Sequence, residues 1–238
     1  MMMKFMTSLL SLFPFSWIGG QLFGQSPTIN VPFSVDFPFK EGSISSVWKE
    51  LPVYSLQKLD EDGREAVTQF QLAYSDKGIY VHFYGDEWKV TTAAKADFED
   101  LFKGDVYEVF FQPDASKPIY LEYEINANNN ELVLLIPNYG GKFLGWTPWK
   151  YEGERKIIKN TWLAENANPA IPYTWHAEIF FPYQIFNPLI QGKPEKGSTW
   201  KGNFYRLDYD TGKMVKWAWS PIAKSFHEYD KYGVLVFM

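Results

Sequence analysis

Short runs of alternating apolar and polar residues, each closed by Pro, Gly or Asn, constrain the fold of this chain more than any other feature. A two-residue period is typical of a half-buried β-strand, because successive side chains point to opposite faces. Such runs cover residues 67–74, 79–84, 106–111, 119–126, 131–136, 175–181, 203–209 and 232–237. Many short strands separated by turn residues predict an all-β sandwich.

Helical patterning is nearly absent. Only residues 92–102 are expected to form one short helix, and residues 183–189 form one turn at most. No internal repeat, low-complexity linker or shift in composition divides the chain. We therefore expect residues 25–238 to form a single domain.

The first 24 residues have the pattern of a secretory signal peptide. Lys4 precedes an apolar run over residues 9–18, and small residues follow at Gly19, Gly20 and Gly24. The run is interrupted by Pro14 and is shorter than the roughly 20 residues that a membrane helix needs. We expect cleavage after Gly24, no membrane span, and a mature protein that is secreted or periplasmic.

Charge and cysteine content exclude several classes of function. The formal net charge is −5 and no block of Lys or Arg occurs, which argues against binding to nucleic acid. The chain has no Cys, so disulfides, thiolate metal sites and Cys nucleophiles are excluded. The three histidines lie in separate segments, and no nucleophile elbow, phosphate loop or zinc motif is present.

Several carboxylates fall on strands where they could meet. Glu122, Glu124 and Asn126 share one face of a predicted strand, because side chains two residues apart point the same way. Glu108 lies on a neighbouring predicted strand, and Glu178 on another. Paired carboxyls suit a glycosidase. The other interpretation is a solvated outer face or salt bridges with nearby basic side chains.

Tryptophans concentrate in predicted loops, where recognition residues commonly lie. Flat indole faces suit the C–H faces of sugar rings, while carboxylates, amides and guanidinium groups bind the hydroxyls. The loop candidates for stacking are Trp88, Trp146, Trp149, Trp217 and Trp219. Within or beside strands, we expect Trp162, Trp175 and Trp200 to pack in the core.

An ordered series of fragments from Trp48 to the C-terminus resembles the family 9 carbohydrate-binding module in a secreted, family-9-like form. The fragments are Thr68-x-Phe70, Asp76-x-Gly78-Ile79-Tyr80-Val81, Gly104-Asp105-Val106-Tyr107-Glu108-Val109-Phe110, Tyr120-x-Glu122-x-Glu124-Ile125-Asn126, Trp175-His176-Ala177-Glu178-Ile179, Asn203-x-Tyr205-Arg206 and Trp217-x-Trp219-Ser220-Pro221, followed by His227 and Tyr232-Gly233. The resemblance implies an antiparallel sandwich with jelly-roll-like topology that binds sugar without catalysis.

The resemblance also implies a sugar ring held between two tryptophans, and structural calcium. We expect Trp88 or the Trp146/Trp149 loop on one side of the sugar and Trp217 or Trp219 on the other. The residues expected to hydrogen-bond the sugar are Glu108, Glu124, Asn126 and Arg206, although Arg206 could instead pair with Glu108 or Glu178. The oxygen ligands of a calcium ion could come from Asp60, Glu61 and Asp62, or from Asp86 and Glu87. No other cofactor is expected.

Three alternatives stay open at this point. The first is a glycoside hydrolase that uses two of Glu108, Glu122, Glu124 and Glu178. The second is a non-covalent haem-binding relative of the same fold, with axial ligands drawn from Met214, His82, His176 and His227. The third is a structural envelope protein whose aromatic residues contact another protein. The preferred hypothesis is a monomeric, exported carbohydrate-binding protein that functions in the use of polysaccharides.

Overall fold

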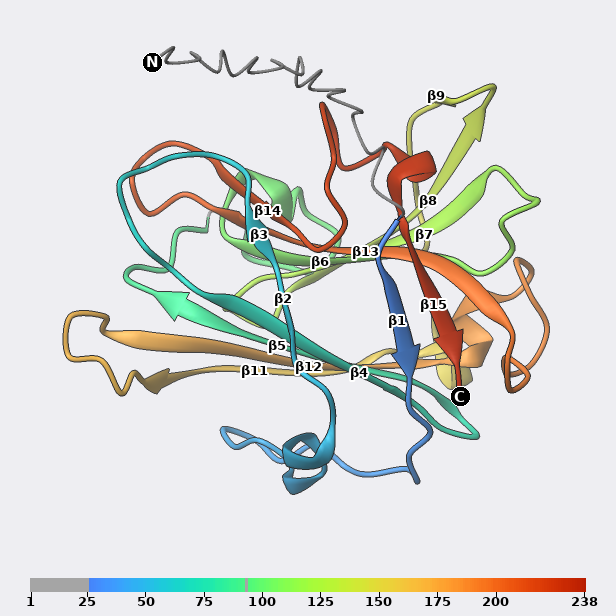
Figure 1. Cartoon of the computed structure of the whole chain (residues 1–238), viewed down its shortest axis with the longest axis horizontal. Coiled ribbons are helices and arrows are strands. Elements are labelled where there is room, and N and C mark those ends of the chain that lie inside the picture. Colours follow the sequence, from blue (N-terminus) through green and yellow to red (C-terminus); the bar gives the residue numbers. More distant parts are fainter. Residues whose placement is uncertain (1–25, 93) are drawn as a thin grey trace, which may run out of the picture.

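Two β-sheets pack face to face in the computed structural model of the protein, which describes residues 26–92 and 94–238 (Figure 1). The larger sheet runs in the order β1-β15-β13-β6-β7-β8-β10, with β14 on β13, β3 on β14 and β9 on β8. Its strands are β1 (Thr28–Val31), β3 (Gln57–Lys58), β6 (Val106–Gln112), β7 (Ile119–Ile125), β8 (Glu131–Tyr139), β9 (Lys142–Phe143), β10 (Thr147–Pro148), β13 (Thr199–Asp208), β14 (Val215–Ala218) and β15 (Gly233–Phe237).

The smaller sheet runs in the order β11-β12-β5-β4-β2. Its strands are β2 (Tyr54–Ser55), β4 (Thr68–Tyr74), β5 (Gly78–Glu87), β11 (Ile158–Glu165) and β12 (Tyr173–Pro182). Neighbouring strands are antiparallel throughout both sheets, except that β1 runs parallel to β15. The predicted all-β antiparallel sandwich is confirmed.

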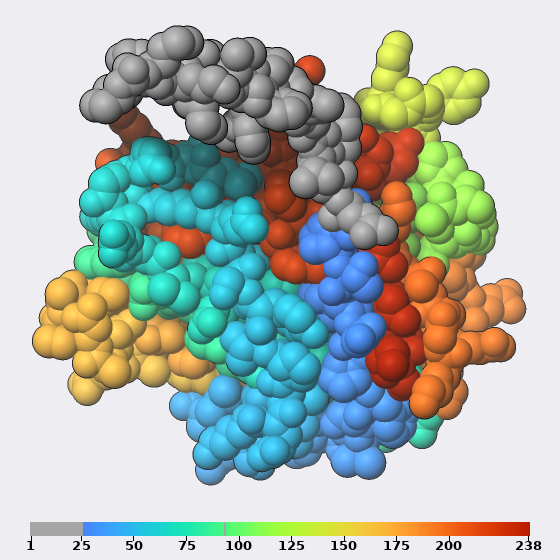
Figure 2. All heavy atoms as spheres, viewed as in Figure 1, coloured from blue at the N-terminus to red at the C-terminus, as the bar shows by residue number. Residues whose placement is uncertain are grey.

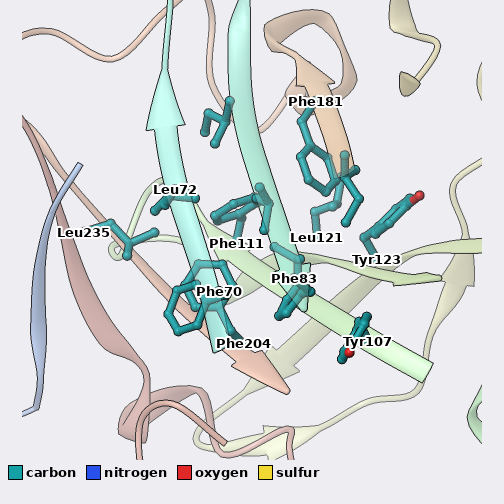
Figure 3. Packing of buried hydrophobic residues seen from close by; sticks show 14 of the residues in the cluster. Phe70, Leu72, Phe83, Tyr107, Phe111, Leu121, Tyr123, Phe181, Phe204 and Leu235 are labelled. Carbon is teal, nitrogen blue, oxygen red and sulfur yellow. The ribbon is translucent and has the colours of Figure 1, made fainter. Parts of the chain in front are cut away.

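Aromatic side chains from the facing surfaces of the two sheets fill the core (Figure 3). Phe70 stacks on Phe204 with ring centroids 4.2 Å apart, and Tyr107 stacks on Trp175 at 3.9 Å. These inward residues alternate with residues on the outer faces, as the two-residue period predicted. The larger sheet therefore presents a second surface, away from the core, on strands β6, β7, β8 and β13.

The expected helix over residues 92–102 differs from what the structure shows. Its described part contains only a 3₁₀ turn, η2 (Leu101–Lys103). Phe98 has a positive φ of 65° and its N–H donates to the Glu131 carbonyl, while the Asp97 carboxylate accepts the Glu131 N–H. The segment thus bonds to the start of β8 rather than to itself, and these contacts outweigh helical patterning.

The remaining helical elements are also single 3₁₀ turns: η1 (Ser46–Glu50), η3 (Gly153–Arg155), η4 (Tyr183–Phe186) and η5 (Tyr229–Lys231). In the described part of the chain, no helix is long and apolar enough to cross a bilayer. The predicted signal peptide, residues 1–24, lies outside the described residues.

Candidate functional site

A cleft of about 290 Å³ opens on the outer face of the larger sheet. Strands β6, β7, β8 and β13 form its floor with Glu108, Phe110, Glu122, Glu124, Leu134 and Leu207. Loops and the neighbouring strand β14 form its walls with Phe102, Trp146, Met214, Lys216, Lys224, Phe226 and His227. Acidic groups on a rigid sheet thus lie beneath aromatic groups on loops.

Strand register brings the three floor glutamates together. Glu108 on β6 lies directly opposite Glu124 on β7, and Phe110 lies opposite Glu122. Because Glu122 and Glu124 are two residues apart, both point to the same face as Glu108. The predicted grouping of these carboxylates is what the structure shows, but Glu178 lies on β12 of the other sheet.

The floor glutamates are buried rather than solvated. Their exposed fractions are 3% for Glu108, 5% for Glu122 and 1% for Glu124. Burial raises the pKa of each carboxyl well above its ordinary value, and the charge of a neighbouring floor glutamate raises it further. The Oε2 atoms of Glu122 and Glu124 are buried without a hydrogen-bond partner. Unmatched acceptors in a cleft suit a ligand that brings donors.

Aromatic rings form the wall on the loop side. Phe226 stacks on Tyr205 of β13 with centroids 3.9 Å apart, and His227 stacks on Phe143 at 4.3 Å. Trp146 is 53% exposed and lies 6.4 Å from the ring of Phe102. Its hairpin, which carries β9, projects from the body of the molecule (Figure 2). The wall therefore offers ring surface to a bound molecule.

Trp217 and Trp219 lie away from this cleft. Both point into the core between the sheets, at 3% and 8% exposure. A Cβ at Gly233 would lie 2.3 Å from the Trp219 ring, so glycine lets β15 approach that indole. Their one-residue spacing does put both on one face, as predicted, and that face is the inner one.

The other two loop tryptophans also lie outside the cleft. Trp149 is half-buried, and its indole N–H donates to the Ile185 carbonyl. Trp88 donates its indole N–H to the Ala170 carbonyl and lies beneath the Arg64 guanidinium. Of the five tryptophans proposed for stacking, the structure places Trp146 in the cleft wall.

Asn126 and Arg206 are fully buried and bind the protein itself. The Asn126 side chain accepts the N–H groups of Asn128 and Asn130 and so holds the turn after β7. Arg206 lies on the inner side of β13 and pairs with Glu87 and Asp208, not with Glu108 or Glu178.

A second acidic cluster surrounds Arg206. Oxygen atoms of Glu87, Asp105 and Asp210 lie within 4.8 Å of one another. Burial raises the pKa of Glu87 to about 9 and that of Asp105 to about 7. The Asp210 Oδ1 atom is buried and has no partner. Calcium takes about six to eight oxygen ligands, so these three carboxylates would supply part of its coordination, with the Asp210 Oδ1 atom as the one oxygen among them that has no partner in the protein.

In the turn of Asp60, Glu61 and Asp62, which was predicted as one of two calcium sites, the two aspartates already have partners within the protein. Asp62 pairs with Lys58 and accepts the Arg64 N–H, and Asp60 accepts the Lys216 N–H. Of the second predicted pair, Asp86 accepts the Val67 N–H and an Asn166 amide, whereas Glu87 belongs to the cluster around Arg206.

The proposed haem ligands do not all lie together. Met214 and His227 line the cleft, whereas His82 and His176 lie on β5 and β12 of the other sheet. The His227 Nδ1 atom is hydrogen-bonded to the Tyr120 hydroxyl at 2.8 Å. Three buried carboxyls occupy the floor, where an apolar macrocycle would need apolar contacts.

Comparison with known proteins assigns the fold to a family. A model of "Carbohydrate-binding family 9" matches residues 59–237. The chain belongs to carbohydrate-binding family 9. The matched range includes every floor residue of the cleft and all the wall residues named above. No curated protein gives a significant match to the sequence.

Solved structures share the fold of this family 9 chain. A candidate carbohydrate-binding protein from Bacteroides uniformis is 18% identical, with a TM-score of 0.71 over 90% of this chain and 100% of the other. A family 9 module from Caldicellulosiruptor kristjanssonii, in complex with glucose, is 14% identical, with a TM-score of 0.60 over 89% and 95% of the two chains. A family 9 module from Caldicellulosiruptor kristjanssonii in complex with cellotriose is also 14% identical, with a TM-score of 0.57 over 88% of this chain and 93% of the other.

Sequence patterning overlooked part of the wall. The sequence pattern does not single out Phe102 or Phe226 as ligand-binding residues, and it suggests Glu122 only as a member of a catalytic pair. Phe226 lies in a loop with no strand period, so alternation gives no signal for it, and its position directly before His227 of the family-like fragments is the sequence feature that could locate it. Tryptophan drew attention because it is large, but phenylalanine presents the same kind of ring face.

Proposed function

We propose that the protein binds a carbohydrate in the cleft over β6, β7, β8 and β13 and does not transform it. The observation that carries this proposal is the pairing of buried, partnerless carboxyl oxygens with exposed aromatic rings in one cleft. Membership of family 9 supports a sugar as the ligand.

The floor supplies the polar half of recognition. A sugar presents several hydroxyl donors in fixed directions, and Glu108, Glu122 and Glu124 offer acceptors on two adjacent strands. Because strands hold these groups more rigidly than loops would, little ordering is needed on binding. Hydroxyl donors would satisfy the Oε2 atoms that have no partner within the protein.

The wall supplies the apolar half. Trp146, Phe102 and Phe226 come from three separate loops and border the same cleft. Their ring faces suit the C–H surface of a pyranose. In this proposal, Trp146, Phe102 and Phe226 stack on the sugar ring in place of Trp217 and Trp219, which lie in the core and cannot contact a ligand.

Export follows from the predicted signal peptide and stays part of the proposal. A secreted or periplasmic, monomeric binding protein with this cleft would serve in the use of polysaccharides outside the cytoplasm. Calcium bound by Glu87, Asp105 and Asp210 would be structural, because these residues lie away from the cleft lining.

The test is a titration of intrinsic Trp fluorescence with glucose, cellotriose and a broad set of oligosaccharides. We expect a saturable change that Trp146→Ala abolishes or reduces strongly, and that Glu108→Gln weakens. Trp88→Phe, which alters an indole outside the cleft, is the control and should retain binding. A flat response to every sugar from folded protein would contradict the proposal.

A glycoside hydrolase is the second candidate, and the grouping of three glutamates favours it. A carboxyl with a raised pKa can act as a general acid, and a neighbouring carboxylate as nucleophile or base. Incubation with oligosaccharides decides between the two functions. Release of sugar that Glu108→Gln or Glu124→Gln abolishes, with the fold retained, would establish hydrolysis; binding without release supports the first proposal.

A further inference from the structure

Among the described residues, no Lys or Arg side chain pairs with the three floor glutamates, a feature that they share with the buried Asp105 and Glu178 but not with four other buried acidic side chains. Glu87 and Asp208 pair with Arg206, Asp210 pairs with Arg64, and Glu131 lies 3.5 Å from Lys159. Among the described residues, no Lys or Arg nitrogen comes within 4.0 Å of Glu108, Glu122 or Glu124. The floor therefore concentrates acidic groups that no Lys or Arg contacts, although Lys216 and Lys224 belong to the cleft wall.

Other groups around the cleft leave the floor uncompensated. His227 lies 3.8 Å from Glu122, but burial lowers the pKa of this histidine to about 4, so it is uncharged at neutral pH. Lys216 lines the cleft wall, but its ammonium lies 3.6 Å from Asp60, which is not a lining residue, and it does not pair with a floor glutamate. Lys224 is exposed at the rim. A positive charge in direct contact with the floor carboxyls has to come from the ligand.

A bare metal ion does not suit this floor. Among the described residues, the acidic oxygens that converge within 4.8 Å belong to Glu87, Asp105 and Asp210, and the floor glutamates form no such group. The floor carboxyls are spread over strands β6 and β7, so they match a molecule larger than a metal ion, such as a ring that carries a charged substituent. The volume of about 290 Å³ is at the lower end for small-molecule sites, which fits one or a few rings.

We propose that the cleft selects sugars with a free amino group, such as glucosamine units, over neutral sugars and against uronic acids. This inference rests on the proposed function. An ammonium group offers three donors and a positive charge to the partnerless Oε2 atoms of Glu122 and Glu124, and charge-assisted hydrogen bonds of this kind are the stronger ones. The aromatic wall adds a favourable environment for a cation. A ligand ammonium group would favour the ionised form of a floor carboxyl, whereas the negative charge of a uronate would disfavour it and leave no cation to pair with.

The experiment compares three β-1,4-linked trimers by calorimetry: cellotriose, the glucosamine trimer and the N-acetylglucosamine trimer. These ligands share length and linkage and differ at carbon 2. We expect the glucosamine trimer to bind at least tenfold more tightly than the other two, and glucuronic acid to bind more weakly than glucose. Acetylation removes the charge, so it should remove the advantage.

Variants locate the effect. Glu122→Gln and Glu124→Gln should each reduce the affinity ratio of glucosamine trimer to cellotriose toward one. Glu195→Gln, which makes the same substitution at an exposed position outside the cleft, should leave the ratio unchanged and so controls for general attraction to an acidic protein. Equal or tighter binding of cellotriose would overturn the inference and leave sugar binding intact. Absence of binding to any sugar would overturn both.

Discussion

At the scale of single residues, burial of the floor glutamates should make the stability of the fold depend on pH. Burial raises the pKa of Glu122 above its ordinary value of 4.5, so the folded protein holds a proton that the unfolded chain releases above that pH. The contribution of this group to stability therefore falls as pH rises from about 4.5 toward neutrality. We predict that Glu122→Gln raises Tm at pH 8 and changes it little at pH 4.

The measurement is the difference in Tm between Glu122→Gln and the unmodified protein from pH 4 to 8. His82 and His176, whose pKa values burial lowers to about 3 and about 4, act in the opposite direction, but equally in both proteins because they lie on the other sheet. Glu195→Gln is the exposed control and should show no trend. A difference that is constant, or largest in acid, would mean that Glu122 is ionised in the folded state.

Two tryptophans should separate binding from stability. Trp146 is 53% exposed in the cleft wall, whereas Trp217 is 3% exposed in the core. We predict that Trp217→Ala lowers the free energy of unfolding by roughly 3–5 kcal/mol, and Trp146→Ala by less than about 0.5 kcal/mol. Chemical denaturation measures both. A large loss of stability from Trp146→Ala would show that this indole has a packing role.

At the scale of elements, β13 joins the two sheets through one side chain. Arg206 donates to Thr68 at the start of β4, to the Asp86 carbonyl and to Glu87 on β5, and it also pairs with Asp208 on its own strand. The guanidinium is fully buried, so its removal leaves carboxylates unpaired in the interior. The charge thus holds both sheets at one end of the sandwich.

We predict that Arg206→Met costs roughly 3–5 kcal/mol of unfolding free energy, because it breaks a buried pair from one side only. Urea denaturation measures the loss. Lys77→Met, which removes a 74% exposed partner of Asp36, is the control and should cost less than about 1 kcal/mol. Equal effects of the two substitutions would indicate that Arg206 does not join the sheets.

Strand elements were predictable from sequence, and loop positions were not. Alternation located β4 to β8, β12, β13 and β15, because inward residues such as Phe111 and outward ones such as Glu108 obey a local period. The same period placed Glu108, Glu122 and Glu124 together. Whether a loop tryptophan is exposed depends instead on distant contacts: Trp219 is buried because Gly233 on β15 leaves room for it.

At the scale of the whole molecule, the acidic cluster links parts of the chain that the fold alone brings together. Glu87 ends β5, Asp105 precedes β6 and Asp210 follows β13, so one ion held by all three would connect both sheets. Arg206 and Arg64 balance only part of this negative charge, because Asp208 also belongs to it. A divalent cation would relieve the repulsion that accompanies burial of these carboxylates.

We predict that calcium stabilises the protein and that chelation reverses the effect. At a free calcium concentration about 100 times Kd, the gain is about 2.7 kcal/mol, which for a chain of this size raises Tm on the order of 5–10 °C. Asp210→Asn removes the carboxylate whose Oδ1 atom has no partner and should abolish the response. Asp62→Asn, in the turn first considered for calcium, should retain it. Calcium bound anywhere else would still raise the Tm of Asp210→Asn, so a shift that survives in this variant would place the ion at another site. The lack of any shift in the unmodified protein would mean that Arg206 and Arg64 neutralise the acidic cluster without a metal ion.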